Sequence, residues 1–365
     1  MIYLDHAATT PICDAAKKAI IEHLDDYGNP SSSYEFGHKS LMLIEDARER
    51  IAKCINAEPE EIYFTSGGSE ADTWALNGKC SLASSIEHHA IQPTFKFKIT
   101  SNGIADLEDI KRILLSNKMY SPIKTSVVSC MMANNEIGTI QPIKEIAEIA
   151  HEHGVLFHTD AVQAMGHISI DVKDINCDML SASGHKFGAP KGVGFLYVKK
   201  NRLELNPLIH GGKQEQGLRG GTENVLGIIA MAAALEDSMT HMEERNRRIR
   251  YMRNRLLNCL LQDDGTFVNG SLYDRVASNI NIRIKGVKGQ DVVAMADQFG
   301  ICISAGSACN EGTATPSHVL KAIGLTDEQA LSSIRITVGH ENTIEDIDYA
   351  CEILPKIIKR LREIN

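Results

Sequence analysis

The chain has 365 residues, of which 43% are hydrophobic and 23% are charged, and its formal net charge is -9. This length suffices for a large core and favours two domains over one, and the composition is that of an ordinary globular protein. The acidic balance argues against nucleic acid as the main partner, because phosphate binding needs a concentrated basic face.

Helical and strand-like segments alternate along the first two thirds of the chain. Strands separated by helical crossovers indicate a mainly parallel sheet covered by helices on both faces. Such sheets bind ligands just beyond the carboxyl ends of their strands. The predicted helices are 15–24, 38–55 and 143–153, and the predicted strands are 61–65, 125–132, 155–159, 178–182 and 193–198, with a further short strand at Ile86.

The pattern changes after a long helix that is predicted at 224–262, either continuous or kinked. The later segments are strands at 278–284, 301–304 and 334–338 and helices at 290–298 and 344–364. We interpret them as a smaller α+β domain joined through the long helix. The expected fold class is therefore α/β, with a large domain of residues 12–255, a small C-terminal domain of residues 256–365, and residues 1–11 joined to the small domain.

The nine cysteines are scattered and contain no CxxC pair, which is typical of reduced thiols in the cytoplasm rather than of a disulfide framework. The N-terminal sequence has no basic segment followed by an apolar run, so no signal peptide is expected. No apolar stretch of about 18 residues predicts a membrane-spanning helix, and no ligand spacing typical of a zinc site occurs. We expect a cytoplasmic protein with no membrane partner and no bound metal.

Lys186 is the first candidate for chemistry, in a loop between Gly184 and Gly188 that follows a predicted strand. A lysine amine forms a Schiff base only when it is deprotonated, and burial or nearby cations lower its pKa. A surface lysine on a turn is the commoner case.

Asp160 ends the predicted strand that precedes the Lys186 strand. A carboxylate at this point can pair with a protonated pyridine nitrogen and keep the ring an electron sink. An aspartate that caps a helix is an equally good explanation of Asp160 alone. Its placement one strand before Lys186 favours a ring held between two adjacent strand ends.

The segment Ser66-Gly67-Gly68-Ser69 follows a strand and opens a helix, where free backbone N–H groups and the helix dipole favour an anion such as phosphate. The alternative is a capping loop with Ser69 as the N-cap. Further donors are available from Ser183, His185 and Thr222. His88 and His89 are candidates for stacking on a ring and for proton transfer, although a lone histidine is more often structural.

Cys309 lies in a small, polar, glycine-containing segment that is predicted to be a mobile loop able to deliver a nucleophile. Most other cysteines lie among apolar or helical residues, which is typical of packing. Arg335 interrupts an apolar strand, so a carboxylate partner is expected, either from a protein acid or from an amino-acid substrate bound bidentately.

Together these segments resemble the cysteine desulfurases, a branch of the class V aminotransferase-like, fold-type I enzymes that depend on pyridoxal 5'-phosphate. The resemblance covers nearly the whole chain, and the order of its motifs is far more specific than any one of them. The matching motifs are 3–11, 28–30, 66–70, 87–88, 134–138, 158–163, 183–186, 219–222, 306–309 and 332–335.

The resemblance implies a role for each candidate in binding pyridoxal phosphate. Lys186 is implied to bind the cofactor covalently, Asp160 to pair with the ring nitrogen, and Gln163 to donate to the ring oxygen. His88 is implied to stack on the ring and transfer protons. The implied phosphate ligands are Gly68, Ser69, Ser183 and His185, with Thr222 reaching the phosphate of the neighbouring subunit in a homodimer.

The resemblance also implies the reaction, in which L-cysteine is converted to L-alanine. Asn135 and Arg335 are implied to bind the substrate carboxylate. Cys309 is implied to accept the sulfur as a persulfide for delivery to an acceptor protein whose identity stays open, as does the pathway, of which iron–sulfur assembly is one possibility. A selenocysteine lyase, another class V enzyme and an inactive binding relative are the alternatives, and the last is disfavoured because Lys186 and Asp160 are both present.

The sequence departs from the family pattern at a few positions. His6 stands where asparagine is common, and Gly68-Ser69 replaces a more usual Ala-Thr, but the capacity to donate hydrogen bonds is kept. The last predicted helix ends close to Asn365, whereas some family members have a further tail that docks an iron–sulfur scaffold protein. Delivery to such a scaffold therefore stays open.

Overall fold

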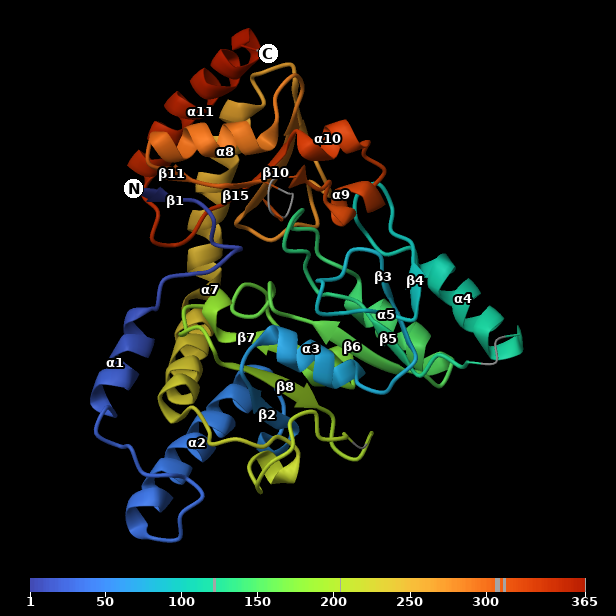
Figure 1. The fold of residues 1–365 in the computed structure, drawn as a ribbon, viewed down its shortest axis with the longest axis vertical. Coiled ribbons are helices and arrows are strands. Elements are labelled where there is room, and N and C mark those ends of the chain that lie inside the picture. The colour runs from blue at the N-terminus through green and yellow to red at the C-terminus, as the bar shows by residue number, and fades with distance from the viewer. Residues whose placement is uncertain (121–122, 204, 306–308, 311–312, 365) are drawn as a thin grey trace.

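The structure is a computed structural model that describes residues 1–120, 123–203, 205–305, 309–310 and 313–364. In these residues a large sheet occupies the lower half of the molecule and a smaller sheet the upper half (Figure 1). Helix α7 (Val225–Leu260) runs from one to the other as a continuous helix. The long helix expected at 224–262 is thus confirmed without a kink.

The large sheet has seven strands in the described residues, in the order β2-β8-β7-β6-β5-β3-β4. Strand β8 is antiparallel to both of its neighbours, and the remaining pairs are parallel. The expected α/β class with a mainly parallel sheet is confirmed. The strands are β2 (Ile62–Thr65), β3 (Ser81–Ser84), β4 (Phe95–Phe97), β5 (Val127–Ser129), β6 (Leu156–Asp160), β7 (Met179–Ser183) and β8 (Gly194–Val198).

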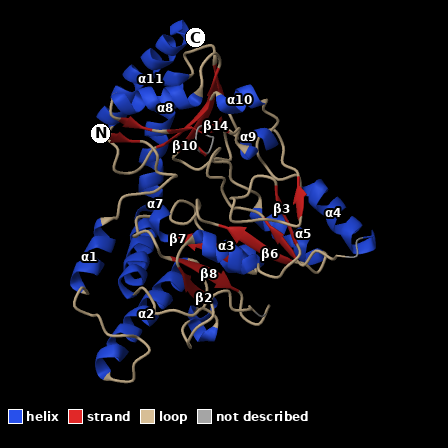
Figure 2. Ribbon diagram, viewed as in Figure 1, coloured by secondary structure: helices blue, strands red, loops and turns tan. Residues whose placement is uncertain are grey.

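Helices cover both faces of this sheet (Figure 2), because alternate strand residues point to opposite sides. Leu180 and Ala182 of β7 belong to the core formed with α1, α2, α5 and α7, whereas Met179 packs with Trp74 of α3. Helix α3 therefore covers the face opposite to those four helices. The helices of this half are α1 (Asp14–Glu22), α2 (Glu35–Cys54), α3 (Gly68–Leu76), α4 (Leu107–Tyr120), α5 (Ile143–Glu152) and α6 (Val172–Ile175).

The upper half has an antiparallel sheet in the order β12-β15-β10-β9. The N-terminal segment joins this half, since β1 pairs with β11 and Leu4 is buried in its core. The remaining elements are β1 (Ile2–Tyr3), β9 (Thr266–Val268), β10 (Asn279–Ile284), α8 (Gly289–Gln298), β11 (Ile301–Cys302), β12 (Ser304–Ala305), β13 (Cys309–Asn310), β14 (Thr313–Ala314), α9 (His318–Ala322), α10 (Asp327–Leu331), β15 (Ser333–Thr337) and α11 (Ile344–Ile364).

Helix α7 contributes to both hydrophobic cores. Its N-terminal part, including Ile228 and Leu235, packs in the core of the large sheet, and Met252 and Leu256 pack in the core of the small one. By length and composition α7 would also suffice for a membrane span, but half of that apolar window is buried inside the protein, as in the core helix of a globular fold. The division at residues 255 and 256 stays a prediction.

Most expected elements agree with the structure to within three residues, but some differ. The expected strand at 125–132 forms a regular ladder only at Val127–Ser129. The residues after it still bond to β6, through Cys130 N to His158 O and Met132 N to Asp160 O. The strand expected at Ile86 ends at Ser84, the one at 301–304 is divided into two, and helix α4 was not predicted.

Candidate active site

A cavity of about 240 Å³ lies at the carboxyl ends of β2, β6 and β7, where the parallel sheet was expected to bind a ligand. Asp160 and Ser183 are the last residues of β6 and β7, and Gly68 begins α3 just after β2. Ten of the predicted site residues line this cavity: Gly68, Ser69, His88, Asn135, Asp160, Gln163, Ser183, His185, Lys186 and Arg335.

Lys186 ends a short 3-10 helix (Gly184–Lys186) that follows β7 directly. Its Nζ donates to Ala7 O at 2.7 Å and to Ala8 O at 2.8 Å. Burial, with the nearby charge of Arg335, lowers the pKa of Lys186 to about 8. A neutral amine keeps two N–H groups for the two carbonyls, and its lone pair is free to react.

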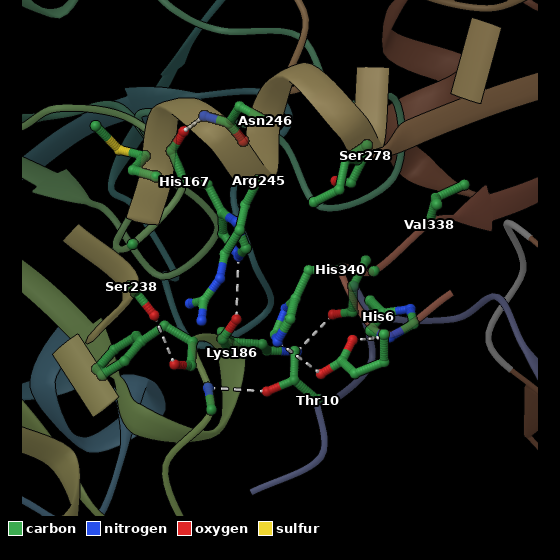
Figure 3. Close-up of a pocket in the computed structure, with 18 of the residues that line it drawn as sticks. His6, Thr10, His167, Lys186, Ser238, Arg245, Asn246, Ser278, Val338 and His340 are labelled. Carbon is green, nitrogen blue, oxygen red and sulfur yellow. Dashed lines mark hydrogen bonds and ion pairs between the residues drawn. The ribbon is translucent and has the colours of Figure 1, made fainter. Parts of the chain in front are cut away.

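The backbone of the Lys186 loop is hydrogen-bonded to residues of α7, of the N-terminal segment and of the segment after β6 (Figure 3). Ser238 Oγ donates to Phe187 O at 3.1 Å, and Gly188 N donates to Thr10 Oγ1 at 2.9 Å. His167 Nε2 donates to Lys186 O at 3.1 Å, and Asn246 Nδ2 donates to His167 O at 2.8 Å. These bonds fix the point from which the lysine side chain enters the cavity.

Asp160 is 4% exposed, and its Oδ1 accepts a hydrogen bond of 2.8 Å from Val162 N. This bond closes a turn and does not cap a helix, because the structure has turns and no helix between β6 and α6. The helix-capping alternative for Asp160 is therefore wrong, and its carboxyl group lies at the cavity wall. Burial raises the pKa of Asp160 to about 6. A cationic partner in the cavity would lower this pKa again, so the site favours a positively charged group next to Asp160.

The loop between β2 and α3 has the geometry of an anion site. Gly67 has φ 153°, a conformation that side-chain-bearing residues avoid, and it is the N-cap of α3. Ser69 is thus in the first turn and is not the N-cap considered from the sequence. A Cβ on Gly68 would lie 2.7 Å from Val162 Cγ2, so glycine lets the helix start pack closely against Val162. Backbone N–H groups at the start of a helix favour an anion.

Two histidines line the cavity in their neutral forms. Burial and the charge of Lys186 lower the pKa of His185 to about 4, and its Nδ1 lies 3.1 Å from Thr9 Oγ1. His88 lies at the exposed mouth, yet partial desolvation and the charge of His89 lower its pKa. Because Ala90 N donates to His88 Nδ1 at 3.1 Å, neutral His88 has its proton on Nε2.

Arg335 has the protein acid that its position in an apolar strand required. Its guanidinium bonds to Asp5 Oδ1 at 2.8 Å and to Asn135 O at 3.0 Å. Its Nε is buried and has no hydrogen-bond partner among the described residues. Nη1 and Nη2 each have a second N–H, and Arg335 lines the cavity, so its guanidinium can also bind a carboxylate there.

Gln163 is a second residue that donates a hydrogen bond to the carbonyl oxygen of Ala7. Its Nε2 donates to Ala7 O at 3.0 Å, the same carbonyl that Lys186 binds. The N-terminal segment thus supplies backbone acceptors to two site residues. Neither of these acceptors has a side-chain signature in the sequence.

Two predicted site residues are not brought into the cavity by this chain. Thr222 is exposed and lies outside the cavity lining. Cys309 begins the short strand β13, which pairs with β14, but its side chain lies outside the described residues. The expectation that Cys309 moves on a loop stays a prediction.

Sequence reasoning missed Asp72, a buried acid on α3 that lines the cavity. One signal was available, because Asp72 lies four residues after Gly68 and therefore on the same face of the helix. A charged residue among Ala71, Trp74 and Ala75 is also unexpected on a buried helix.

Comparisons with known proteins agree with this geometry. Residues 2–350 match the model of the aminotransferase class-V family. A protein named cysteine desulfurase IscS from Methanosarcina thermophila is 42% identical over 380 residues, which cover 100% of this chain and 93% of the relative. A protein of the same name from Clostridium botulinum is 43% identical and is covered to 96%.

Solved structures show the same fold. A NifS-like protein from Rickettsia africae has a TM-score of 0.90 and 32% identity, with 98% of this chain and 99% of that chain covered. A structure described as SspA in complex with cysteine has a TM-score of 0.79 and 32% identity, with 94% and 100% covered. The chain therefore belongs to the class-V aminotransferase family and, within it, to the cysteine desulfurases.

Proposed function

We propose that this cysteine desulfurase uses pyridoxal phosphate to convert L-cysteine to L-alanine and passes the sulfur to Cys309. The observation that carries the proposal is that Lys186, Asp160, His88 and Arg335 line one cavity, although they come from four separate parts of the chain. The cysteine bound to the SspA relative supports cysteine as the substrate.

The residues of the cavity fit the proposed cofactor. The start of α3 would bind its phosphate together with Ser69, Ser183 and His185. Asp160 would bind its ring nitrogen, since the raised pKa of this buried acid favours a cationic partner. Lys186, whose pKa is about 8, would bind its aldehyde carbon, and His88 would lie against the ring.

Bound pyridoxal phosphate supplies an electron sink for the substrate's α-carbon. Within this arrangement the amine of Lys186 and Nε2 of His88 take up and return protons. Arg335 and Asn135, which both line the cavity, bind the substrate carboxylate and so orient the amino acid.

Cys309, in its thiolate form, would attack the sulfur atom of the substrate. A sulfur–sulfur bond forms as the bond between the substrate sulfur and its β-carbon breaks, and the electron pair of the broken bond remains with that carbon. The carbon then takes a proton, so the products are a persulfide on Cys309 and alanine. A sulfur-acceptor protein would afterwards remove the outer sulfur.

The proposed active form is a homodimer in which Thr222 completes the phosphate site of the neighbouring subunit. The loop that contains Thr222 is firmly attached to this subunit, because Arg219 pairs with Glu70 at 2.9 Å and Glu215 pairs with Arg48 at 2.9 Å. Thr222 nevertheless faces outward. Co-expressed Lys186→Ala and Thr222→Val chains should regain one complete site, and mixed dimers without activity would contradict the shared site.

We propose the cytoplasm as the compartment, which is consistent with the free thiols of the eight cysteines whose side chains the structure describes.

The function is tested by the visible spectrum of the purified protein, followed by assays of alanine and sulfide after addition of L-cysteine. We expect an absorption band of covalently bound pyridoxal phosphate and equal amounts of the two products. The Lys186→Ala variant should lack that band and both products. A colourless protein that takes up no pyridoxal phosphate would overturn the proposal.

A further inference from the structure

Asp72 is a buried acid for which the proposed reaction has no role. It lies on α3, and its side chain lines the cavity beside Asp160. The residue is 1% exposed, and its Oδ1 has no hydrogen-bond partner in the described part of the chain. An ionised carboxylate with an unpartnered oxygen is costly at such a position.

The residues beneath α3 form a line of polar side chains on one face of the sheet. His158 and Asp160 lie two residues apart on β6 and so point to the same side, and Ser181 on β7 is directly opposite Asp160. The buried His158 ring lies between Ser129 Oγ at Nδ1 and Ser181 Oγ at Nε2, each at 2.9 Å. Ser181 is also close enough to Asp72 for its hydroxyl to lower the pKa of that acid.

None of the polar side chains in this line carries a positive charge that could pair with an ionised Asp72. Burial and the charge of Asp160 raise the pKa of Asp72 and outweigh the opposite effect of Ser181. Burial likewise raises the pKa of Glu87 to about 7 and, with the charge of Lys79, lowers the pKa of His158 to about 3. His158 Nε2 is 3.8 Å from Asp72 Oδ1, too far for a hydrogen bond, and a neutral imidazole makes no ion pair.

The hydrogen bonds are consistent with a proton on Asp72. Its O–H then donates to Ser181 Oγ, the Ser181 hydroxyl donates to His158 Nε2, and the protonated Nδ1 of His158 donates to Ser129 Oγ. Each donor in this series of three hydrogen bonds has one acceptor. With an ionised Asp72 every bond would reverse and the same contacts would still be satisfied, so the hydrogen bonds alone do not decide between the two states. The ionised form is disfavoured because it would place a second negative charge beside Asp160.

We propose that Asp72 holds a proton at neutral pH and acts as a positioning residue, donating to Ser181 and leaving Asp160 as the only charged carboxylate against the cofactor ring. The role assigned to Asp160 rests on the proposed function. The protonation of Asp72 does not, because it is a property of the protein without cofactor.

Infrared spectroscopy of cofactor-free protein grown with carbon-13-labelled aspartate tests the proton directly. At about pH 8, Asp160 is mostly ionised because its pKa is about 6, and glutamates such as Glu87 carry no label. We expect a protonated-carboxyl band that shifts with the label and is absent from Asp72→Asn. A wild-type spectrum without such a band, or a band that persists in Asp72→Asn, would overturn the proposal. The absence of the band from the labelled wild-type protein overturns the proposal even if the variant does not fold.

The affinity of cofactor-free protein for pyridoxal phosphate, followed by fluorescence, provides a second test. An asparagine amide donates to Ser181 as the protonated acid does, so Asp72→Asn should bind within about threefold of wild type. If Asp72 were ionised, the loss of its charge would lower the pKa of the cofactor's ring nitrogen. The affinity for the cationic ring would then fall by about tenfold for each unit of that pKa decrease. Such a loss would contradict the proposal, whereas failure of both proteins to bind would refute the proposed function and leave the infrared result valid.

Discussion

The reactivity of Lys186 depends on its pKa, which nearby charged residues shift. Substitutions of two of these residues, Arg335 and Asp5, should therefore change the pKa of Lys186 in opposite directions. Burial and Arg335 lower the pKa of Lys186 from 10.5 to about 8, while Asp5 acts in the opposite direction. Near pH 8 about half of the Lys186 amines are neutral, compared with well under 1% of ordinary lysines, an advantage of roughly 100-fold.

Changing Arg335 to Gln removes a positive charge and leaves Asp5 unpaired, so the pKa of Lys186 should rise. Changing Asp5 to Asn leaves Arg335 unneutralised, so the same pKa should fall. A neighbouring charge in a partly buried site shifts a pKa by about 1 unit, which sets the expected size of both changes. The neutral amine increases with pH, so the rate of covalent attachment should rise with pH to a plateau, with a midpoint near 8 in wild type.

The assay is the rate at which cofactor-free protein attaches pyridoxal phosphate, measured by absorbance over a range of pH. Cysteine is absent, so the proposed role of Arg335 in substrate binding does not enter. We expect a higher midpoint for Arg335→Gln and a lower one for Asp5→Asn. A wild-type midpoint of an ordinary lysine, or shifts of the same sign in both variants, would refute the reasoning.

Three further predictions follow from individual contacts. Cys309→Ser should bind pyridoxal phosphate and cysteine with wild-type spectra but release no sulfide, and normal turnover would mean that another cysteine is the acceptor. Gly194→Ala should weaken pyridoxal phosphate binding at least tenfold (about 1.4 kcal/mol), because its Cβ would lie 2.5 Å from Ala182 O and 2.7 Å from Gly67 Cα; wild-type affinity in a fluorescence titration would contradict this. Arg48→Met should lower the free energy of unfolding in urea by about 3–5 kcal/mol, because it leaves Glu215 buried without the two 2.9 Å bonds from Arg48. The Arg48→Met/Glu215→Leu double variant should recover much of that loss, and equal stability of the single and double variants would show that the pair is unimportant.

Residues at the ends of strands were predictable because strand periodicity fixes where each strand stops. Asp160 and Ser183 end β6 and β7, and the loop at Gly67 follows β2, so local patterns alone brought them to one edge of the sheet. Helix α4 had a comparable signal that was overlooked, since its buried Ile110 and Leu114 lie one turn apart.

Contacts between distant segments were not predictable in the same way. The sequence indicated a carboxylate for Arg335, but Asp5 is 330 positions away and meets it only because Asp5 forms a β-bridge with Thr337 at the end of β15. The carbonyls of Ala7 and Ala8, which bind Lys186, belong to residues whose side chains reveal nothing of this role. Asp72 required knowledge of which helix face lies against β6 and β7.

The most direct test of sulfur transfer is mass spectrometry of the peptide that contains Cys309, after the holoenzyme has been incubated with L-cysteine without a reductant. We expect one additional sulfur atom on Cys309, with alanine formed in equal amount, and neither in the Lys186→Ala variant. Extra sulfur on a different cysteine, or alanine formed while Cys309 stays unmodified, would contradict sulfur transfer to Cys309.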